Sequence, residues 1–265
     1  MSNPRVPILP FDIIEEIVDI LINNRTKGLQ CVKDFSLVCQ SFLPLCRKHI
    51  FSSVSIKISS PESLDIYNGE AFGRLLLERP GIAICVYKLK ICIEQPDSES
   101  KYFLEQVSRQ LTRLQSLTIS HSMHGNQMYW HNISSSTQSS LLNLMHLPTL
   151  THLDIRCITS FPKSGLIACT NVKHFCAHRL YIRDDEAQSS PSHKPLKLQS
   201  FNVLLRFPRS LILLEAMCSD GRPVLDFTDL EKIYIDFEWV DGTIIKNILK
   251  KCQQLRDISL RIDGM

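Results

Sequence analysis

The sequence predicts a mixed α/β fold in two parts, a short helical module followed by a larger region of alternating strands and helices. Within residues 9–50, apolar residues recur at spacings of three and four, which is the period of an amphipathic helix. From Phe51 onward the period changes to short strand-like units. The chain has 265 residues, 44% of them hydrophobic, which suffices for a small module joined to a medium-sized domain. We therefore place an N-terminal tail at residues 1–7, the helical module at 8–51 and the repeat region at 52–265.

Three short helices are expected in the module. Pro10 suits the first turn of the first helix, because its missing N–H would have had no partner there. The second helix is expected over residues 29–39, and a third short one from Ser41 to Cys46. The first helix has its apolar residues at helical spacing: Ile13, Ile14, Ile17, Ile20 and Leu21. A unit of about 40 residues has too small a core to stand alone, so we expect a partner or a neighbouring domain to cover its apolar faces.

The repeat region contains a unit of the form apolar-x-x-apolar-x-apolar. Its first positions are 51, 86, 114, 150, 172, 198, 230 and 255. These spacings scatter around the roughly 20–29 residues of a leucine-rich repeat, and the last two apolar positions of each unit alternate as in a strand. We expect helices near 72–77, 102–107, 210–218 and 242–249, loops at 94–101, 121–140 and 183–197, and thus an irregular, leucine-rich-repeat-like βα solenoid. Five residues follow Leu260, too few for a capping repeat, so we expect a poorly capped or truncated end.

Composition and charge narrow the possible partners. The net charge of +3 and the pI near 8.3 are too mild for nucleic-acid binding. No apolar run approaches the roughly 18 residues of a membrane span, and no secretory signal precedes the first helix. The ten cysteines lie in apolar segments without paired spacing, so we expect reduced, buried thiols. These features predict a soluble intracellular protein, cytoplasmic or nuclear, that binds neither nucleic acid nor membrane.

Motifs for catalysis, cofactors and metals are sparse. The nine glycines form no phosphate-binding pattern, and we expect no cofactor. Cys169, His174, Cys176 and His178 make the densest metal-like cluster, but isolated His and Cys on a strand are commonly inert, so we expect no metal. Cys176 between two histidines is the one place where a Cys/His hydrolase could be sought. Asp236 and Glu238 would share a strand face, where we expect solvated charges.

Two separated signatures in the module resemble an F-box of the type common in fungal proteins. Residues 9–17 (LPFDIIEEI) are similar to its opening, and residues 35–42 (FSLVCQSF) are similar to its second signature, with Phe42 in place of the usual Trp. Residues 49–54 match the form in which fungal F-boxes end. The resemblance implies a surface that docks on the Skp-family adaptor of SCF ubiquitin ligases. It implies that Leu9, Pro10, Ile13, Ile14, Ile17, Val38 and Phe42 face that adaptor. From the residues alone, some of these side chains would instead form the three-helix core.

The function implied by this resemblance is that of a substrate receptor, not an enzyme. The module would recruit the adaptor and, through it, a cullin-RING ligase, while the exposed face of the repeats would present a protein substrate. The candidate substrate face comprises Lys88, Lys90, His152, Asp154, His174, Asn202, Lys232, Tyr234 and Asp236, with Ser116, Thr118, Cys176, Ser200, Asp257 and Ser259 alongside. Two alternatives stay open at this point. One is a solvated sheet without a partner, and the other is a leucine-rich interaction scaffold that acts outside any ligase.

Overall fold

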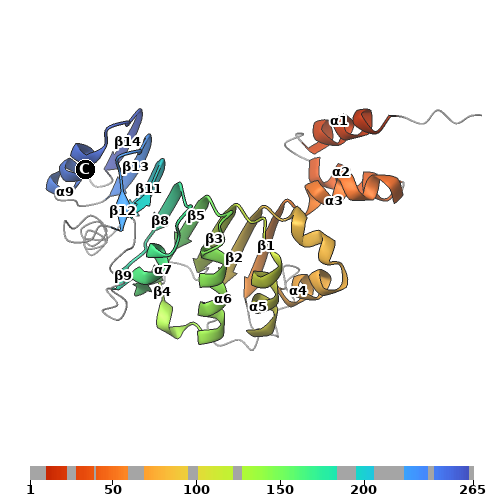
Figure 1. Cartoon of the computed structure of the whole chain (residues 1–265), viewed down its shortest axis with the longest axis horizontal. Helices are drawn as coiled ribbons and strands as arrows, with labels where there is room; N and C mark the ends of the chain where they lie inside the picture. Colours follow the sequence, from red (N-terminus) through yellow and green to blue (C-terminus); the bar gives the residue numbers. More distant parts are fainter. Residues whose placement is uncertain are drawn as a thin grey trace, which may run out of the picture.

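The structure, a computed structural model, describes residues 10–22, 28–38, 40–58, 69–94, 101–121, 127–183, 195–205, 224–237 and 242–262. A single eight-stranded sheet dominates it (Figure 1). Its strands pair in parallel and in the order of the chain: β1 (Ser53–Ile58), β2 (Lys88–Ile93), β3 (Ser116–His121), β5 (His152–Arg156), β8 (His174–His178), β11 (Ser200–Leu205), β13 (Lys232–Phe237) and β14 (Asp257–Ile262). Each of the eight apolar units found in the sequence supplies one of these strands. The predicted mixed α/β class is therefore confirmed, with a large parallel sheet at its centre.

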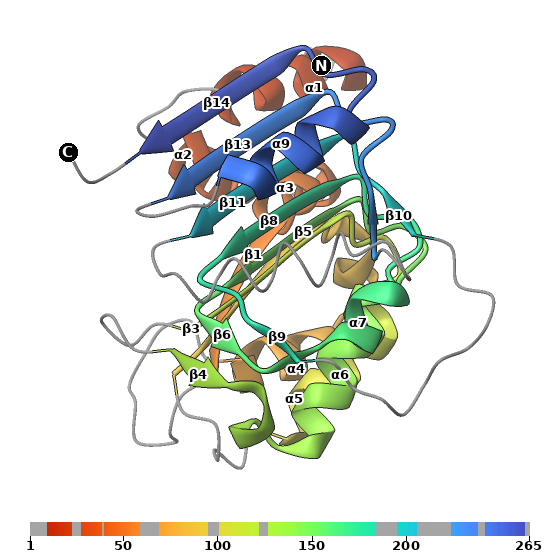
Figure 2. The same ribbon diagram turned by 90° about the vertical axis from the view of Figure 1, so that its left-hand side faces the viewer.

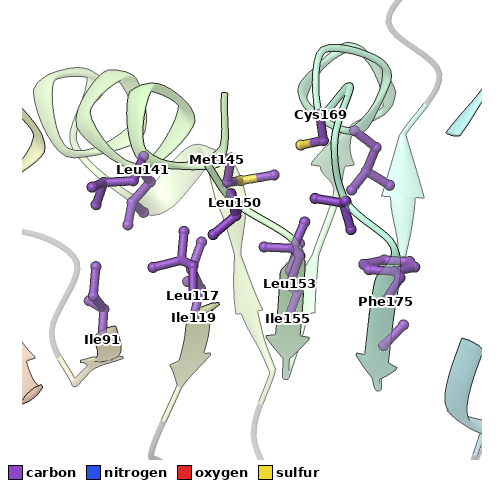
Figure 3. Close-up of a cluster of buried hydrophobic side chains, with 14 of the residues drawn as sticks. Ile91, Leu117, Ile119, Leu141, Met145, Leu150, Leu153, Ile155, Cys169 and Phe175 are labelled. Atoms are coloured by element: carbon purple, nitrogen blue, oxygen red, sulfur yellow. The ribbon is translucent and has the colours of Figure 1, made fainter. Parts of the chain in front are cut away.

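The register of the strands aligns equivalent repeat positions into rows. Leu89 of β2 is opposite Leu117 of β3, which is in turn opposite Leu153 of β5. All three side chains are almost fully buried. Figure 3 shows Leu117 and Leu153 pointing with Ile91, Ile119 and Ile155 toward the helical layer, which contributes Leu141 and Met145. Because side chains alternate between the two faces of a strand, this arrangement sends every intervening polar residue to the opposite face.

Helices cover the apolar face of the sheet, which leaves the other face open (Figures 1 and 2). They are α4 (Gly69–Glu78), α5 (Lys101–Gln110), α6 (Ser135–Met145), the short α7 (Lys163–Ile167) and α9 (Gly242–Lys251), with 3₁₀ turns η2 (Pro80–Cys85) and η3 (Trp130–Asn132). The predicted helices near 72–77, 102–107 and 242–249 are confirmed. The one expected at 210–218 lies outside the described residues.

The prediction of a loop at 121–140 is wrong for most of the described residues in that range, and residues 122–126 lie outside the described part of the chain. His121 still belongs to β3, and residues 128–132 form the short strand β4 (Met128–Tyr129) and then η3. Helix α6 begins at Ser135, where the Ser134 hydroxyl caps it by accepting a hydrogen bond from the Thr137 N–H at 3.4 Å. The polar run that suggested a loop is the first half of this helix. Its Thr137 and Ser140 are buried, because small hydroxyl side chains fit against neighbouring elements.

Three two-stranded ladders of very short parallel strands lie beside the main sheet. They pair β4 with β6 (Ile158–Thr159), β7 (Phe161–Pro162) with β9 (Ile182–Arg183), and β10 (Leu196–Lys197) with β12 (Leu225–Asp226). Two residues are too few to show a period, so these strands could not be predicted from apolar spacing. Strands β9 and β10 fall at the ends of the predicted loop 183–197, and most of that loop and of 94–101 lies outside the described residues.

Two glycines allow α4 and α5 to approach closely. Gly69 and Gly73 lie four residues apart on α4, so both face the same side of the helix. A Cβ at Gly69 would overlap with the ring of Phe103 in α5, and one at Gly73 would lie 2.8 Å from the Phe103 Cβ. Phe103 is 6% exposed, so its ring has little room to move. The absence of two methyl groups therefore sets the separation of these helices.

A repeated hydrogen-bond pattern fixes the amino ends of the strands. The Ser52 carbonyl accepts the N–H groups of Tyr87 and Lys88 at 3.1 and 2.9 Å. At the far end of the sheet, the Glu231 carbonyl accepts those of Arg256 and Asp257 at 2.8 and 3.0 Å. Between them, the same two-donor arrangement recurs at the carbonyls of Tyr87, Gln115, Thr151, Lys173 and Gln199. The described strands therefore start in step, which keeps the rows of side chains aligned across the sheet.

The N-terminal helices form a separate small core beyond β1 (Figure 1). They are α1 (Phe11–Ile22), α2 (Gly28–Ser36) and α3 (Leu43–Ile50), with the 3₁₀ turn η1 (Gln40–Phe42) before α3. Val18, Val32 and Cys46 are fully buried at its centre. The second helix ends at Ser36, three residues earlier than predicted, and Leu37–Val38 form a turn. The expected third helix is present, but its first residues are the 3₁₀ turn.

Candidate partner-binding surfaces

Helix α1 has two adjacent apolar stripes, only one of which the chain itself covers. Ile14 and Val18 are buried at 6% and 0% exposure and face the other helices. Ile13 and Ile20 are 39% and 64% exposed, and Ile17 between them is half-buried. Spacings of four and three place Ile13, Ile17 and Ile20 on one side of the helix. A helix with an uncovered apolar stripe is the usual mark of a surface that a partner covers.

Helix α2 and the turn after it add more exposed apolar surface. Leu29 is 45% exposed, and Leu37 and Val38 are 85% and 72% exposed. Of the ten exposed large hydrophobic side chains among the described residues, five belong to the module: Ile13, Ile20, Leu29, Leu37 and Val38. The module is a small part of the chain, so this is a concentration of apolar surface. We call these five residues and Ile17 the apolar surface of the module.

The structure sorts the residues predicted to face an adaptor into three groups. Pro10, Ile13 and Val38 are exposed, and Ile17 is half-buried. Ile14 is 6% exposed and offers little area to a partner. Phe42 is half-buried, packs on the small core and stacks on Phe35 with ring centroids 4.8 Å apart. Leu9 lies outside the described residues.

Sequence analysis missed Ile20, Leu29 and Leu37 as candidates for this surface. Ile20 follows Ile13 by seven residues, so a helical projection of α1 could have found it. No local sequence pattern predicts the exposure of Leu29 and Leu37, because their exposure depends on where α2 ends and on how α2 packs against its neighbours.

Polar contacts hold α3 against α1 behind this surface. Lys48 Nζ lies 3.4 Å from Glu15 Oε1. His49 Nε2 lies 3.4 Å from Asp19 Oδ1 but makes no hydrogen bond, so this pair attracts only when the imidazole is protonated. Gly28 opens α2 where a Cβ would lie 2.5 Å from the Ile22 carbonyl oxygen, so only glycine fits so close to the end of α1. The three helices therefore present their outer side chains from a fixed frame.

The second candidate surface is the face of the sheet that none of the described helices covers, which we call the open face. Its first two rows, read from β1 to β14, are Ser53, Lys88, Ser116, His152, His174, Ser200, Lys232 and Asp257, and then Ser55, Lys90, Thr118, Asp154, Cys176, Asn202, Tyr234 and Ser259. Asp236 lies in a third row beside Arg261. Every residue predicted for the substrate face lies on this face. At about 4.8 Å per strand, each row spans roughly 34 Å.

Two histidines form a stack in the middle of the first row. The rings of His152 and His174 lie 4.1 Å apart at an interplanar angle of 21°. Burial is the main cause that lowers the pKa of both imidazoles. For His152, the neighbouring His174 and Lys88 lower the pKa further, because a second positive charge is unfavourable there. Both rings are therefore held in the neutral form above their lowered pKa values.

Asp154, Arg156 and Cys176 make a polar cluster beside the stack. Asp154 accepts hydrogen bonds from Arg156, with Nε 2.9 Å from Oδ2. Burial, and secondly the Asp154 carboxylate, raise the pKa of the Cys176 thiol to about 12. A nucleophilic cysteine needs a lowered pKa, so this environment acts against a Cys/His hydrolase at Cys176. Cys169, the most buried member of the predicted cluster, has its pKa raised to about 12 by burial.

Toward β14 the open face becomes rich in hydrogen-bonding groups. The Tyr234 hydroxyl donates to Asp236 at 3.4 Å, and Asp236 is 5% exposed. The buried amide oxygen of Asn202, one strand away from Tyr234, has no hydrogen-bond partner in the structure. Glu238, the predicted companion of Asp236, lies outside the described residues.

The described parts of the chain contain no group of three or more His, Cys, Asp or Glu side chains able to hold a metal ion. His174, Cys176 and His178 do share one face of β8, but Cys169 lies apart in the buried layer. None of the helices that the structure describes is long and apolar enough to cross a membrane. No family model matches the chain, and no curated protein matches its sequence.

Proposed function

We propose that the chain is a substrate receptor of an SCF-type ubiquitin ligase. In this proposal residues 8–51 are an F-box that docks on a Skp-family adaptor, and residues 52–265 are an irregular leucine-rich-repeat-like solenoid that holds a protein substrate. The observation that carries the proposal is the apolar surface of the module, which lies where the F-box-like signatures are. The two separate hydrophobic cores support a division of the chain near residue 51.

The size of this surface is sufficient for a stable complex. Fully burying a Leu, Ile or Val side chain is worth about 1.5–3 kcal/mol. Leu37 and Val38 keep most of their surface in water, and Ile20 keeps 64% of it, so each could contribute about 1–2 kcal/mol when a partner covers it. Apolar anchors on helices that enter a groove are a common mode of recognition.

The open face supports the second half of the proposal. It is a mixed polar surface of Lys, His, Asp, Asn and Tyr side chains on a rigid parallel sheet, and binding groups on rigid elements are held in place. Its length of roughly 34 Å matches an extended segment of about ten residues.

The mechanism that follows is proximity. The module would fix the chain to the ligase, and the open face would hold the substrate, so that ubiquitin transfer becomes a local event. The described residues would contribute position and affinity, and the chemical step would take place on the ligase.

The first test uses substitutions on the apolar surface of the module. The wild-type chain, the V38D variant and the L37D variant are each co-expressed with a Skp-family adaptor. A matched control is L77D, because Leu77 is an exposed apolar residue at 55% on α4, outside the module. We expect the wild type and L77D to co-purify with the adaptor and the two module variants to lose it. If soluble, folded wild type fails to bind, the ligase proposal is wrong, and the scaffold interpretation takes its place.

The second test addresses the open face. Proteins that accumulate when the chain is deleted are compared with those that accumulate when it carries N202A and Y234A. The two side chains are half-buried and lie on β11 and β13, whereas the module lies beyond β1 at the other end of the sheet (Figure 1). We expect the variant to bind the adaptor normally and to lose capture of the same substrates. Unchanged capture would refute the open face as the substrate site and leave the docking proposal intact.

A further inference from the structure

The open face carries an excess of positive charge on the half that lies nearest the helical module. Lys88 and Lys90 are two residues apart on β2, so both side chains project from this face. Both are exposed. No carboxylate of the described residues lies within ion-pair distance of either ammonium group. Their charges are therefore available to a partner.

The acidic side chains on the same half of the face already have basic partners. Glu94, just after β2, has its Oε1 atom 3.2 Å from Lys57 Nζ. Both oxygens of Asp154 accept hydrogen bonds from Arg156 Nε, at 3.0 and 2.9 Å. These hydrogen bonds are the main cause that raises the pKa of the Arg156 guanidinium, so the two charges stay paired. Among the described residues of β1 to β8, the lysines of β2 are thus two bases without matching acids.

The other half of the face has no such excess. Lys232 of β13 lies opposite Asp257 of β14, and Asp236 lies opposite Arg261. Charges of opposite sign are therefore neighbours there. The surplus is confined to the part of the face around β2, which is second in the sheet, next to the strand that follows the module (Figure 1).

Two hydroxyl groups lie beside the lysines. In the parallel register, Ser116 and Thr118 of β3 are opposite Lys88 and Lys90. Both side chains are half-buried, and neither hydroxyl makes a hydrogen bond with the described parts of the chain. A carboxylate accepts hydrogen bonds, and ammonium and hydroxyl groups donate them. A carboxylate placed here can therefore be contacted by a lysine and by the neighbouring hydroxyl at the same time.

We propose that the open face binds an extended acidic polypeptide segment, with two of its carboxylates placed on Lys88 and Lys90 and on the hydroxyls of Ser116 and Thr118. Side chains two residues apart in an extended segment are separated by roughly 6.7 Å, which is also the separation of the two lysines along β2. The segment therefore carries Asp or Glu at alternate positions. This inference rests on the proposed role of the open face as the substrate site, and it names the class of substrate.

A polypeptide fits this face better than a nucleic acid does. Proteins that bind single strands stack the bases on aromatic side chains. The rings of His152 and His174 stack on each other with centroids 4.1 Å apart, so a base cannot enter between them. Tyr234 donates a hydrogen bond to Asp236 and lies on β13, five strands away from β2. Charged groups spaced along a peptide match the lysines without any need for a stacking surface.

Fluorescence anisotropy with the whole purified chain tests this inference. The probe is a short labelled peptide in which Glu and Gly alternate, and two matched probes carry Gln or Lys in place of Glu. We expect the wild type to bind the Glu probe most tightly, and to bind it less tightly as salt is added, because salt screens exposed charges. The K88E/K90E variant should bind the Glu probe about tenfold more weakly and should prefer the Lys probe.

Two further variants separate a defined site from diffuse attraction. K246E/K250E lowers the net charge by the same amount, but at exposed positions of α9, in the helical layer on the other side of the sheet. It should bind the Glu probe like the wild type. S116A/T118A keeps the charge and removes the two hydroxyl donors, so it should bind the Glu probe severalfold more weakly. Circular dichroism of each variant checks that the fold is intact.

Several results would overturn the inference. They are equal binding of the Glu and Gln probes, an equal loss in K246E/K250E and K88E/K90E, and no loss in S116A/T118A. Tighter binding of a labelled single-stranded DNA that K88E/K90E abolishes would also overturn it, because the site would then belong to nucleic acid. Co-purification with the adaptor is measured for the same chains. Adaptor binding without Glu-probe binding refutes this inference alone, and Glu-probe binding without adaptor binding refutes the ligase proposal alone.

Discussion

Because Gly69 lies so close to Phe103, the effects of substituting these two residues on the free energy of unfolding should not be additive. A methyl group at Gly69 would overlap the far end of the Phe103 ring, and the ring is too buried to move aside. We expect G69A to lower the free energy of unfolding by about 1–3 kcal/mol, the usual cost of overpacking. F103A alone should cost about 3–5 kcal/mol.

The double variant separates packing from helix propensity. In the F103A background the ring is gone, so G69A should cost nothing or gain up to about 1 kcal/mol from the better helix propensity of alanine. The two substitutions should therefore be coupled by about 1–3 kcal/mol or more. G73A provides the matched control, because its methyl would meet the Cβ of Phe103 at 2.8 Å, and alanine retains that atom.

Urea unfolding followed by circular dichroism gives the four free energies of this cycle. We expect the cost of G69A to vanish in the F103A background and the cost of G73A to persist there. Additive effects of G69A and F103A within about 0.5 kcal/mol would refute the packing of α4 on α5 described above.

Three further predictions concern the open face and α6. Removing the negative charge with D154N should lower the pKa of Cys176 from about 12 and speed its alkylation severalfold at mildly alkaline pH, as followed by mass spectrometry; an unchanged rate would contradict the proposed influence of Asp154. Folding lowers the pKa values of His152 and His174, so the unfolded chain binds more protons than the folded chain, and the free energy of unfolding should fall as the pH drops below 6.5. A variant with both histidines replaced by glutamine should show a shallower fall when urea unfolding is measured at several pH values. S134A should cost about 1 kcal/mol by removing the cap of α6, and thermal unfolding that matches the wild type would argue against that cap.

The eight strands of the main sheet were predictable from the sequence, because each lies in an apolar unit with a strand-like alternation. The six inner units each place two buried apolar residues two positions apart, as in Leu117 and Ile119, and the parallel register repeats the unit in the next strand. The same alternation placed His152 and His174 on one face. That their rings stack depended on the register between β5 and β8, which the separate units do not specify.

Other elements could not be predicted because tertiary contacts determine them. Helix α6 begins with six polar residues, and it forms because Thr137 and Ser140 find room against neighbouring elements and Leu141, Leu144 and Met145 enter the main core. The exposure of Leu37 depends on α2 ending at Ser36, earlier than its apolar period suggests.

In the module, sequence analysis predicted which helices carry the candidate surface, but it did not predict correctly which side chains of those helices are exposed. Ile13, Ile14 and Ile17 all fit the apolar period of α1, and period alone cannot tell the stripe that faces the small core from the one that faces solvent. In the structure Ile14 and Val18 are buried. The side chains of α1 that remain available to an adaptor are therefore Ile13, Ile17 and Ile20.

The most direct test of the proposed function is hydrogen–deuterium exchange of the whole chain with and without a purified Skp-family adaptor. Docking through the apolar surface of the module should slow amide exchange in α1 and in residues 28–38, and leave α9 and β14 unchanged. Complex formation that protects the open face instead, or no protection of the module at saturating adaptor, would contradict the account.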